Sequence, residues 1–301
     1  MRPERGMPWG RGITGTPRTV LMAAVLGTGA LMSPGSTAAQ SQTDLLLHGS
    51  LVDYEASQVK KDGFVVGAYG TWGTGYRHLL EVGGSWTRLR FRTATDLDQV
   101  DAAAAYNFYS TRGSLRAGGH FISATDELTD GGLVLFGGGS LYDVGRWSLG
   151  ADGAWSRYPN YDGGLYATQV APTGGLTLKS ADLKYTFGVT ARGYFIWLSE
   201  TAGQGKRDFA SGELSASLTS GRLTLSGYGW LGEQAFAVRQ SGFTVFNLSE
   251  LHKGGFGAGL RWVTSLQSAL SAGFYVERFT DLGFSGTAIA RTLSLSFGYT
   301  F

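Results

Sequence analysis

The C-terminal segment from Arg291 to Phe301 constrains the fold most, because apolar residues alternate along it with small or polar ones. Successive side chains of a strand point to opposite faces, so this segment has one apolar face and one face of Thr, Ser and Gly. The same two-residue alternation recurs along the chain, at residues 45–51, 64–72, 100–108, 147–155, 183–197, 256–262 and 270–276. This repetition predicts an all-β chain and argues against a helical or α/β fold.

Composition narrows the kind of sheet that these strands can form. Charged residues make up 16% of the chain, against about 25% in an ordinary soluble domain, and the mean hydropathy is −0.04. After the N-terminal region, no apolar segment approaches the ~20 residues that a membrane helix needs. In lipid, only helices and closed barrels satisfy all backbone hydrogen bonds. The sequence therefore predicts an antiparallel up-and-down transmembrane β-barrel, and the absence of cysteine excludes disulfides and thiolate sites.

The connections between the predicted strands alternate in length. Short turns are expected at 73–75, 111–113, 144–145, 180–181, 221 and 265, and longer polar loops at 60–62, 93–99, 125–131, 159–163, 200–207, 233–253 and 280–287. They join about fourteen strands (roughly 12 to 16), with both termini on the short-turn end, as in single-chain barrels. In the strand around residues 165–178, Pro172 and the Gly174-Gly175 pair predict a bulge or an edge-like defect.

Residues 1–39 are interpreted as a signal peptide. Four arginines precede an apolar stretch from Val20 to Met32, and the small residues Ser36-Thr37-Ala38-Ala39 follow it. The alternative is an N-terminal membrane anchor, for which the apolar stretch is short. Cleavage after Ala39 would remove four Arg and one Glu and change the net charge from +2 to about −1, so no nucleic-acid partner is expected. Residues 40–301 are predicted to form one barrel domain without an N-terminal plug.

The C-terminal segment also carries a family resemblance. A terminal Phe301 with Tyr299 two residues before it resembles the last strand of bacterial outer-membrane β-barrels, which the barrel assembly machinery reads as a signal. The resemblance implies an integral outer-membrane protein that contacts lipid and meets that machinery through Phe301. In size, short turns and lack of a plug, the chain is similar to compact barrels of the YaiO type. Aromatic girdles at the two interfaces are expected from Trp72, Trp147, Trp155, Trp197, Trp230 and Trp262.

The face opposite the apolar one is predicted to line the lumen. It carries charges of both signs, and ionisable groups at membrane depth imply an aqueous or paired interior. The residues are Asp44, His48, Glu81, Asp101, Arg116, His120, Asp152, Lys184, Arg192, Glu213, Arg261 and Glu277. One interpretation is a channel in which these charges select a small-molecule solute. The other is a closed barrel filled by salt bridges.

One connection, residues 233–253, is long and unusually apolar. Connections longer than about 15 residues are often functional or disordered, and this composition argues against disorder. It is expected to fold inward as a constriction, or to line a site for an apolar ligand at the mouth. The alternative is that residues 243–248 extend the hairpin or add two strands. As possible gate residues we take Phe236, Arg239, Phe243, Phe246, Glu250 and His252.

The residues favour a passive channel or uptake pore over an enzyme. The histidines are His48, His78, His120 and His252, and none lies in a lipase-like or metal-binding motif. No catalytic residue, metal or cofactor is therefore predicted. The alternatives are a non-conducting scaffold or membrane component of an envelope or polysaccharide-export assembly and, as a third, a lipid-modifying enzyme.

Overall fold

The structure is a computed structural model that describes residues 43–74, 77–161, 163–247 and 250–301. The predicted signal peptide, residues 1–39, lies outside the described residues. In the part of the chain that is described, no helix is long and apolar enough to cross a membrane.

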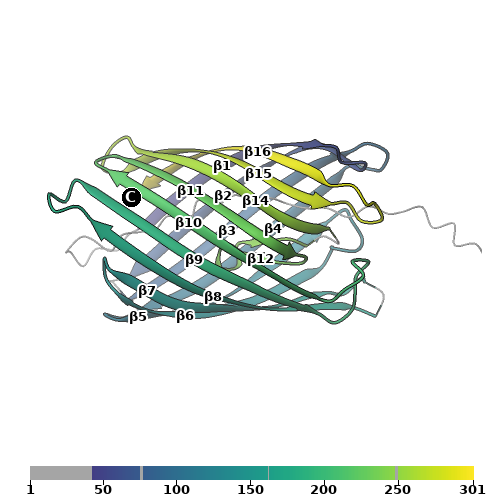
Figure 1. Cartoon of the computed structure of the whole chain (residues 1–301), viewed down its shortest axis with the longest axis horizontal. Helices are drawn as coiled ribbons and strands as arrows, with labels where there is room; N and C mark the ends of the chain where they lie inside the picture. Colours follow the sequence, from purple (N-terminus) through teal and green to yellow (C-terminus); the bar gives the residue numbers. More distant parts are fainter. Residues whose placement is uncertain (1–42, 75–76, 162, 248–249) are drawn as a thin grey trace, which may run out of the picture.

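Fourteen antiparallel strands close into one barrel, in which each strand pairs with its neighbours in sequence and β1 pairs with β16 (Figure 1). This confirms the predicted fold and strand number. The strands are β1 (Thr43–Glu55), β2 (Lys60–Thr74), β3 (His78–Phe91), β4 (Leu97–Tyr109), β5 (Gly113–Ala124), β6 (Gly132–Asp143), β7 (Trp147–Tyr158), β8 (Leu165–Lys179), β9 (Tyr185–Leu198), β10 (Asp208–Ser220), β11 (Leu223–Gln234), β14 (Leu251–Val263), β15 (Ser268–Thr280) and β16 (Ala288–Thr300).

The alternation of the sequence becomes the inside and the outside of the barrel. Leu51 is 65% exposed on the outer face, and its neighbour Val52 is 8% exposed on the inner face. Along β16, Leu293, Leu295 and Phe297 are likewise exposed, between buried Thr292 and Ser294. The barrel is thus apolar outside, as lipid contact requires.

Five of the six predicted girdle tryptophans lie on the outer face, and Trp230 does not. Trp230 is 2% exposed, inside the lumen. On β11 the side chain of Trp230 points to the same face as that of Tyr228, and the exposed Leu225 and Leu231 point to the opposite face. The girdle assignment of Trp230 was therefore wrong.

Strand β8 is continuous across Pro172. The pairing of β8 with β9 runs from Ala167 to Lys179 and is interrupted at Ala171 and Pro172, and the register on either side of this gap is the same. Proline has no N–H to give to the ladder, so bonds are missing there without any inserted residue. The predicted defect is a gap in the ladder and not a bulge.

The turn between β8 and β9 is longer than the sequence suggested, and this corrects the placement of Lys184. Asp182 accepts hydrogen bonds from the Ser180 hydroxyl (2.6 Å) and from the Lys184 backbone N–H (3.2 Å), and Leu183 has φ +57°. These local contacts end the alternation before Tyr185. The Lys184 side chain is 73% exposed beside Asp182, so it does not line the lumen.

The described part of the connection between β11 and β14 turns back into the barrel, and we call residues 235–247 together with Glu250 the inner loop. It contains the strands β12 (Val238–Arg239) and β13 (Thr244–Val245), joined by the 3-10 turn η1 (Gln240–Gly242). Figure 1 shows β12 within the outline of the barrel. Two short strands are thus added, as one alternative held, but they lie inside the lumen and do not extend the hairpin outward.

Candidate functional site: a loop docked in the lumen

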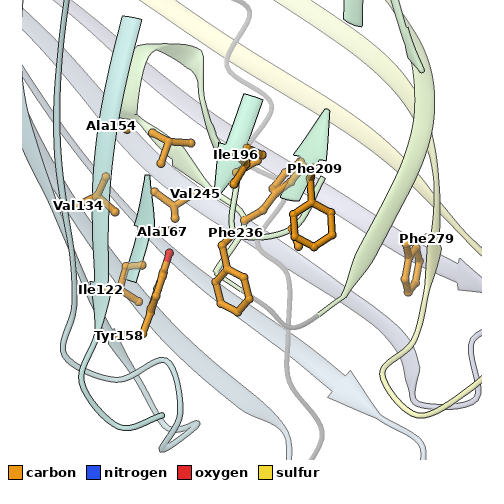
Figure 2. Close-up of a cluster of buried hydrophobic side chains, with 14 of the residues drawn as sticks. Ile122, Val134, Ala154, Tyr158, Ala167, Ile196, Phe209, Phe236, Val245 and Phe279 are labelled. Carbon is orange, nitrogen blue, oxygen red and sulfur yellow. The ribbon is translucent and has the colours of Figure 1, made fainter. Parts of the chain in front are cut away.

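The inner loop forms an apolar core with the barrel wall, shown in Figure 2. Phe236 is 1% exposed, and its ring packs against Tyr158 (centroids 5.1 Å apart) and Tyr161 (5.7 Å). The other buried apolar residues of the loop are Ala235, Ala237, Val238, Val245 and Phe246, and wall residues that meet them include Ile122, Val134, Ile196, Leu198, Phe209 and Phe279. Burial of aromatic and branched side chains contributes roughly 1.5–3 kcal/mol each. The long-loop half of the lumen is thus packed like the interior of a soluble protein.

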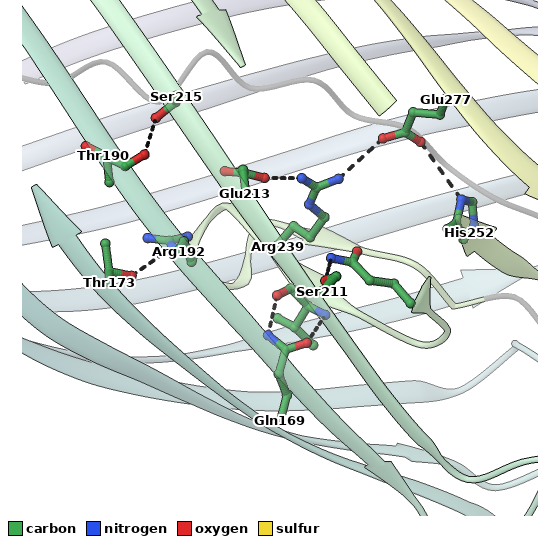
Figure 3. A network of polar contacts seen from close by, with 12 residues as sticks. Gln169, Thr173, Thr190, Arg192, Ser211, Glu213, Ser215, Arg239, His252 and Glu277 are labelled. Atoms are coloured by element: carbon green, nitrogen blue, oxygen red, sulfur yellow. Dashed lines mark hydrogen bonds and ion pairs between the residues drawn. The ribbon is translucent and has the colours of Figure 1, made fainter. Parts of the chain in front are cut away.

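Polar contacts fix the loop on one side of the lumen (Figure 3). Gln169 on β8 donates to the Val238 carbonyl (2.6 Å) and accepts from the Val238 N–H (2.9 Å). Beside it, the Arg239 guanidinium bridges Glu213 on β10 and Glu277 on β15, the latter at 3.3 Å. Arg239 is 8% exposed and lies over the Trp230 ring, 5.2 Å from its centroid. The cation of the loop therefore has two carboxylates and aromatic faces around it, as a buried charge requires.

A second set of polar contacts fixes the loop to β4 and β5. The Asn247 amide donates to Gln99 (2.8 Å), and the Gln99 amide donates to Asp101 (3.0 Å). Asp101 lies 2.9 Å from His120 Nε2, and His120 Nδ1 lies 3.0 Å from the Gly242 carbonyl. These contacts thus run from Asn247 of the inner loop through β4 and β5 and back to Gly242 of the same loop.

The tip of the loop reaches the middle part of the barrel. Phe243 packs edge-on against Tyr69 (5.3 Å between centroids) and lies near Phe136 (6.2 Å). Gly242 has φ +101°, and a Cβ there would lie 2.3 Å from the Phe136 ring. Only glycine therefore fits at this point.

Beneath the tip, Arg116 pairs with Glu81 at 2.7 Å, and its guanidinium lies over the rings of Phe136 and Phe243. Asp152 and Arg192 form a further pair at 3.5 Å. Between these pairs and the loop lies a cavity of about 10 Å³. This volume holds about one water molecule, so the lumen is nearly filled at this level.

Two irregularities in the wall turn side chains inward at the base of the loop. The register of β2 with β3 shifts between Lys60 and Asp62, and that of β14 with β15 shifts between His252 and Gly254. A bulge reverses the side-chain parity beyond it. Lys60 and His252, which would otherwise face outward, are thus fully buried inside.

Lys60 pairs with Glu250 at the rim, and its Nζ lies 4.7 Å from the centroid of the Phe279 ring. His252 stacks on Phe246 (4.5 Å) and lies 4.0 Å from both Glu250 and Glu277. Glu250 precedes β14 and is 1% exposed. Burial raises the pKa of Glu250 to about 7, and the nearby Lys60 opposes this rise.

Below the loop, the lining of the short-turn half becomes small and polar. Inward positions there include Ser217, Thr219, Thr224, Ser271, Ser294 and Ser296. His48 lies over Gly67, where a Cβ would be 2.4 Å from its Nε2. Asp44 accepts from Thr71 and Thr300, and Arg261 lies on the inward side of β14 and is exposed.

The structure thus brings together Glu81 with Arg116, Asp101 with His120, Asp152 with Arg192, and Glu213 with Glu277 through Arg239. All six predicted gate residues contact the wall or the base of the loop. Sequence reasoning missed Lys60, Gln99, Gln169 and Asn247. Alternation alone would have identified Gln169 as an inward amide. Lys60 and Gln99 were assigned to the external loops 60–62 and 93–99, and no sequence signal marks the bulge at Lys60.

The backbone of the inner loop is held in an unfavourable conformation. Phe236, Gln240 and Ser241 have φ values of +53°, +49° and +52°. Such left-handed conformations of residues other than glycine persist only where surrounding contacts impose them, and they cluster at switch regions.

Comparison with known proteins identifies the fold but no family. No family model matches the chain, and no curated protein matches it in sequence. Among solved structures, the Ralstonia pickettii toluene transporter TbuX is similar with a TM-score of 0.54 at 8% identity, over 88% of this chain and 90% of TbuX. The CymD monoaromatic hydrocarbon channel is similar with a TM-score of 0.53 at 9% identity, over 87% and 89% of the two chains. The chain shares the barrel fold of bacterial membrane channels.

Proposed function

We propose that the chain spans the outer membrane as a passive channel or uptake pore for small solutes, with the inner loop as its gate. The observation that carries this proposal is the docking of the loop. A segment in strained backbone conformations fills a lumen whose remaining lining is polar and carries charges of both signs. The fold that the chain shares with TbuX and CymD supports a transport role. Lipid on the outer face and the assembly machinery at Phe301 are the partners this implies.

Two features of the lumen bear on solute choice. The short-turn half offers hydroxyl groups, His48 and Arg261 to a polar solute. The long-loop half offers aromatic rings that the inner loop itself covers. A small solute that carries both an apolar and a polar part fits this lining, with Glu81, Arg116, Asp152 and Arg192 as the charges that it meets beneath the tip.

Shortening the inner loop tests the gate. Gln234 pairs with His252, so Ala235 would face Leu251, and residues 236–250 can be replaced by a two-residue turn that closes the hairpin. In planar bilayers we expect the shortened protein to give larger and steadier conductance steps than the wild type. Shortening the exposed loop at residues 203–205 serves as the control. Unchanged conductance after removal of the inner loop, in protein shown to be folded by heat-modifiable gel mobility, would refute gating.

The filled lumen also favours a second function, a non-conducting scaffold within an envelope assembly. If both the wild type and the shortened variant are silent in bilayers, and a periplasmic protein co-purifies in stoichiometric amount, the scaffold replaces the channel. The resemblance to YaiO-type barrels stays a prediction.

An enzymatic role finds no support in the surroundings of His120. Hydrolases that use histidine need a nucleophile within hydrogen-bond reach of the base. His120 faces the Asp101 carboxylate and the Gly242 carbonyl, and neither is a nucleophilic hydroxyl. We therefore expect no hydrolase activity.

A further inference from the structure

His120 has a hydrogen-bond acceptor at each ring nitrogen. The Gly242 carbonyl lies 3.0 Å from Nδ1, and an oxygen of Asp101 lies 2.9 Å from Nε2. A backbone carbonyl only accepts, so Nδ1 must carry the proton in the first contact. A neutral imidazole then has no proton left for the second contact, and a carboxylate has none to give.

Both contacts exist together only if the pair of Asp101 and His120 holds one additional proton. Either His120 is an imidazolium that donates at both nitrogens, or Asp101 is protonated and donates to Nε2. In either form the pair has no net charge, which suits a site where His120 is 3% and Asp101 7% exposed. We propose that binding of this proton to the pair of Asp101 and His120 stabilises the docked inner loop. Low pH then holds the loop in the lumen, and high pH releases it. This inference rests on the proposed role of the loop as a gate.

The neighbours of Asp101 determine which contact breaks when the proton leaves. Asp101 also accepts from the Gln99 amide (3.0 Å), whose own carbonyl accepts from Asn247, so its orientation is fixed. After a proton passes from the pair to water, the neutral imidazole keeps its remaining proton on Nε2, facing the Asp101 carboxylate. Nδ1 then presents a lone pair to the Gly242 carbonyl. These two acceptors repel each other, and the tip of the loop loses its contact with β5.

Few other charges surround the pair. On the flanking strands, His120 lies opposite Ala103 of β4 and Val134 of β6, which do not titrate. Along β5 the nearest inward charge is Arg116, which Glu81 of β3 neutralises. Tyr158 of β7 is a further titratable group near Asp101, and Ser85 of β3 contacts the carboxylate at 3.5 Å. From the described part of the inner loop, the Gly242 carbonyl makes the hydrogen bond to the ring.

Trypsin reports the position of the loop directly. Arg239 is the only Lys or Arg between Arg222 and Lys253, and docking leaves it 8% exposed. Cleavage after Arg239 therefore measures the fraction of time that the loop spends outside the lumen. This readout does not depend on conduction, so it tests the proton even if the barrel proves to be a closed scaffold.

Asp101→Asn is the decisive variant. The side-chain amide introduced by D101N would donate to Nε2 of a neutral His120, and Nδ1–H would still donate to Gly242, so docking needs no added proton. Full-length folded protein is compared with this variant at pH 5.5 and pH 8. Loss of one hydrogen bond to a charged pair corresponds to about tenfold in the docking equilibrium. We expect wild type and D101N to be nicked at similar rates at pH 5.5, and the wild type about tenfold faster at pH 8.

The ratio of the two rates at each pH cancels the pH dependence of trypsin itself. His120→Phe, which removes both contacts, should be nicked quickly at both pH values, and His48→Gln should behave as the wild type. If the ratio of the tryptic cleavage rate of the wild type to that of D101N stays constant from pH 5.5 to pH 8, the proposal is overturned. Slow nicking of H120F at both pH values would also overturn it. If H120F does not fold, the comparison with D101N still decides.

Discussion

Gln169 and Val238 are joined by two hydrogen bonds, although they lie on the barrel wall and on the inner loop. The side-chain amide of Gln169 pairs with the backbone N–H and carbonyl of Val238, much as a neighbouring strand would. Both groups are buried, so neither finds a replacement partner if the other is removed.

Removing this pairing should weaken docking of the loop. Gln169→Leu leaves the Val238 N–H and carbonyl buried and unpaired, at a cost of about 1–3 kcal/mol. We expect faster tryptic cleavage after Arg239 and more frequent open events in bilayers. Thr168→Val, at the outward position beside it, is the matched control. Equal cleavage of Q169L and T168V would show that the pairing does not hold the loop.

Removing the cation of the loop should have a larger effect. Arg239→Met leaves Glu213 and Glu277 in the lumen without the cation that bridges them, and breaking a buried pair in this way costs about 3–5 kcal/mol. We expect a largely open gate, measured as conductance and as chymotryptic cleavage at the phenylalanines of the loop. Adding E213Q and E277Q removes the uncompensated charges and should restore much of the docking. Failure of this rescue would count against the charge argument.

Glycine at position 242 should be required for docking and not for folding. Gly242→Ala places a Cβ against the Phe136 ring in a left-handed conformation, so we expect the loop to leave the lumen. Heat-modifiable gel mobility should show an intact barrel while cleavage after Arg239 increases. Gly221→Ala is the control, because Gly221 also has positive φ (+55°) but has nothing within 4 Å of its added Cβ. A G242A protein as resistant to trypsin as G221A would contradict the packing argument.

The rim pair should add its own pH dependence. The docked loop holds the pKa of Glu250 at about 7, above the ordinary value of about 4.3. The docked state thus binds the proton more tightly than the released state. Docking therefore strengthens as the pH falls from about 7 to about 4.3, the ordinary pKa of a glutamate. Above pH 7 the protonation of Glu250 no longer stabilises the docked loop.

Lys60→Met removes the cation that opposes the rise in the pKa of Glu250. The pH at which half of the loops are docked, the midpoint of docking, should therefore move to a higher value. The exposed neighbour supplies the control, Lys61→Met, which should leave the midpoint in place. Both are measured in the D101N protein, where the proton of His120 no longer contributes. An unshifted midpoint in the Lys60→Met protein would mean that Glu250 is not the titrating group.

The C-terminal residue should matter for assembly more than for stability. Phe301 is 68% exposed, and its ring packs edge-on against Tyr299 (4.9 Å between centroids). Deleting Phe301 removes little buried surface, so we expect the refolded barrel to keep its thermal stability. In cells we expect much less protein in the outer membrane, measured by fractionation. Normal amounts would argue against recognition of the C-terminal strand through Phe301.

Local alternation determined the barrel, its strand number and most of its inward side chains. Asp101, His120, Glu213 and Glu277 could be assigned to the lumen because side-chain parity is a property of neighbouring residues. The length and apolar composition of residues 233–253 likewise marked them as exceptional. The error at Lys184 arose because the local contacts of Asp182 interrupt the alternation. The error at Trp230 arose although its strand alternates regularly, because its tryptophan side chain was taken as a girdle residue without regard to parity.

Only the tertiary structure decided which of these side chains meet, and that the loop lies inside. Gln169 reaches Val238, and His120 reaches Gly242, across stretches of chain that no periodicity connects. Bulges reverse the parity of Lys60 and His252 at the rim, and Trp230 faces the Arg239 guanidinium and not lipid. The physical reason is that alternation fixes only the face of a strand. Contacts across a lumen depend on closure, on strand register and on the volume that remains for the loop to fill.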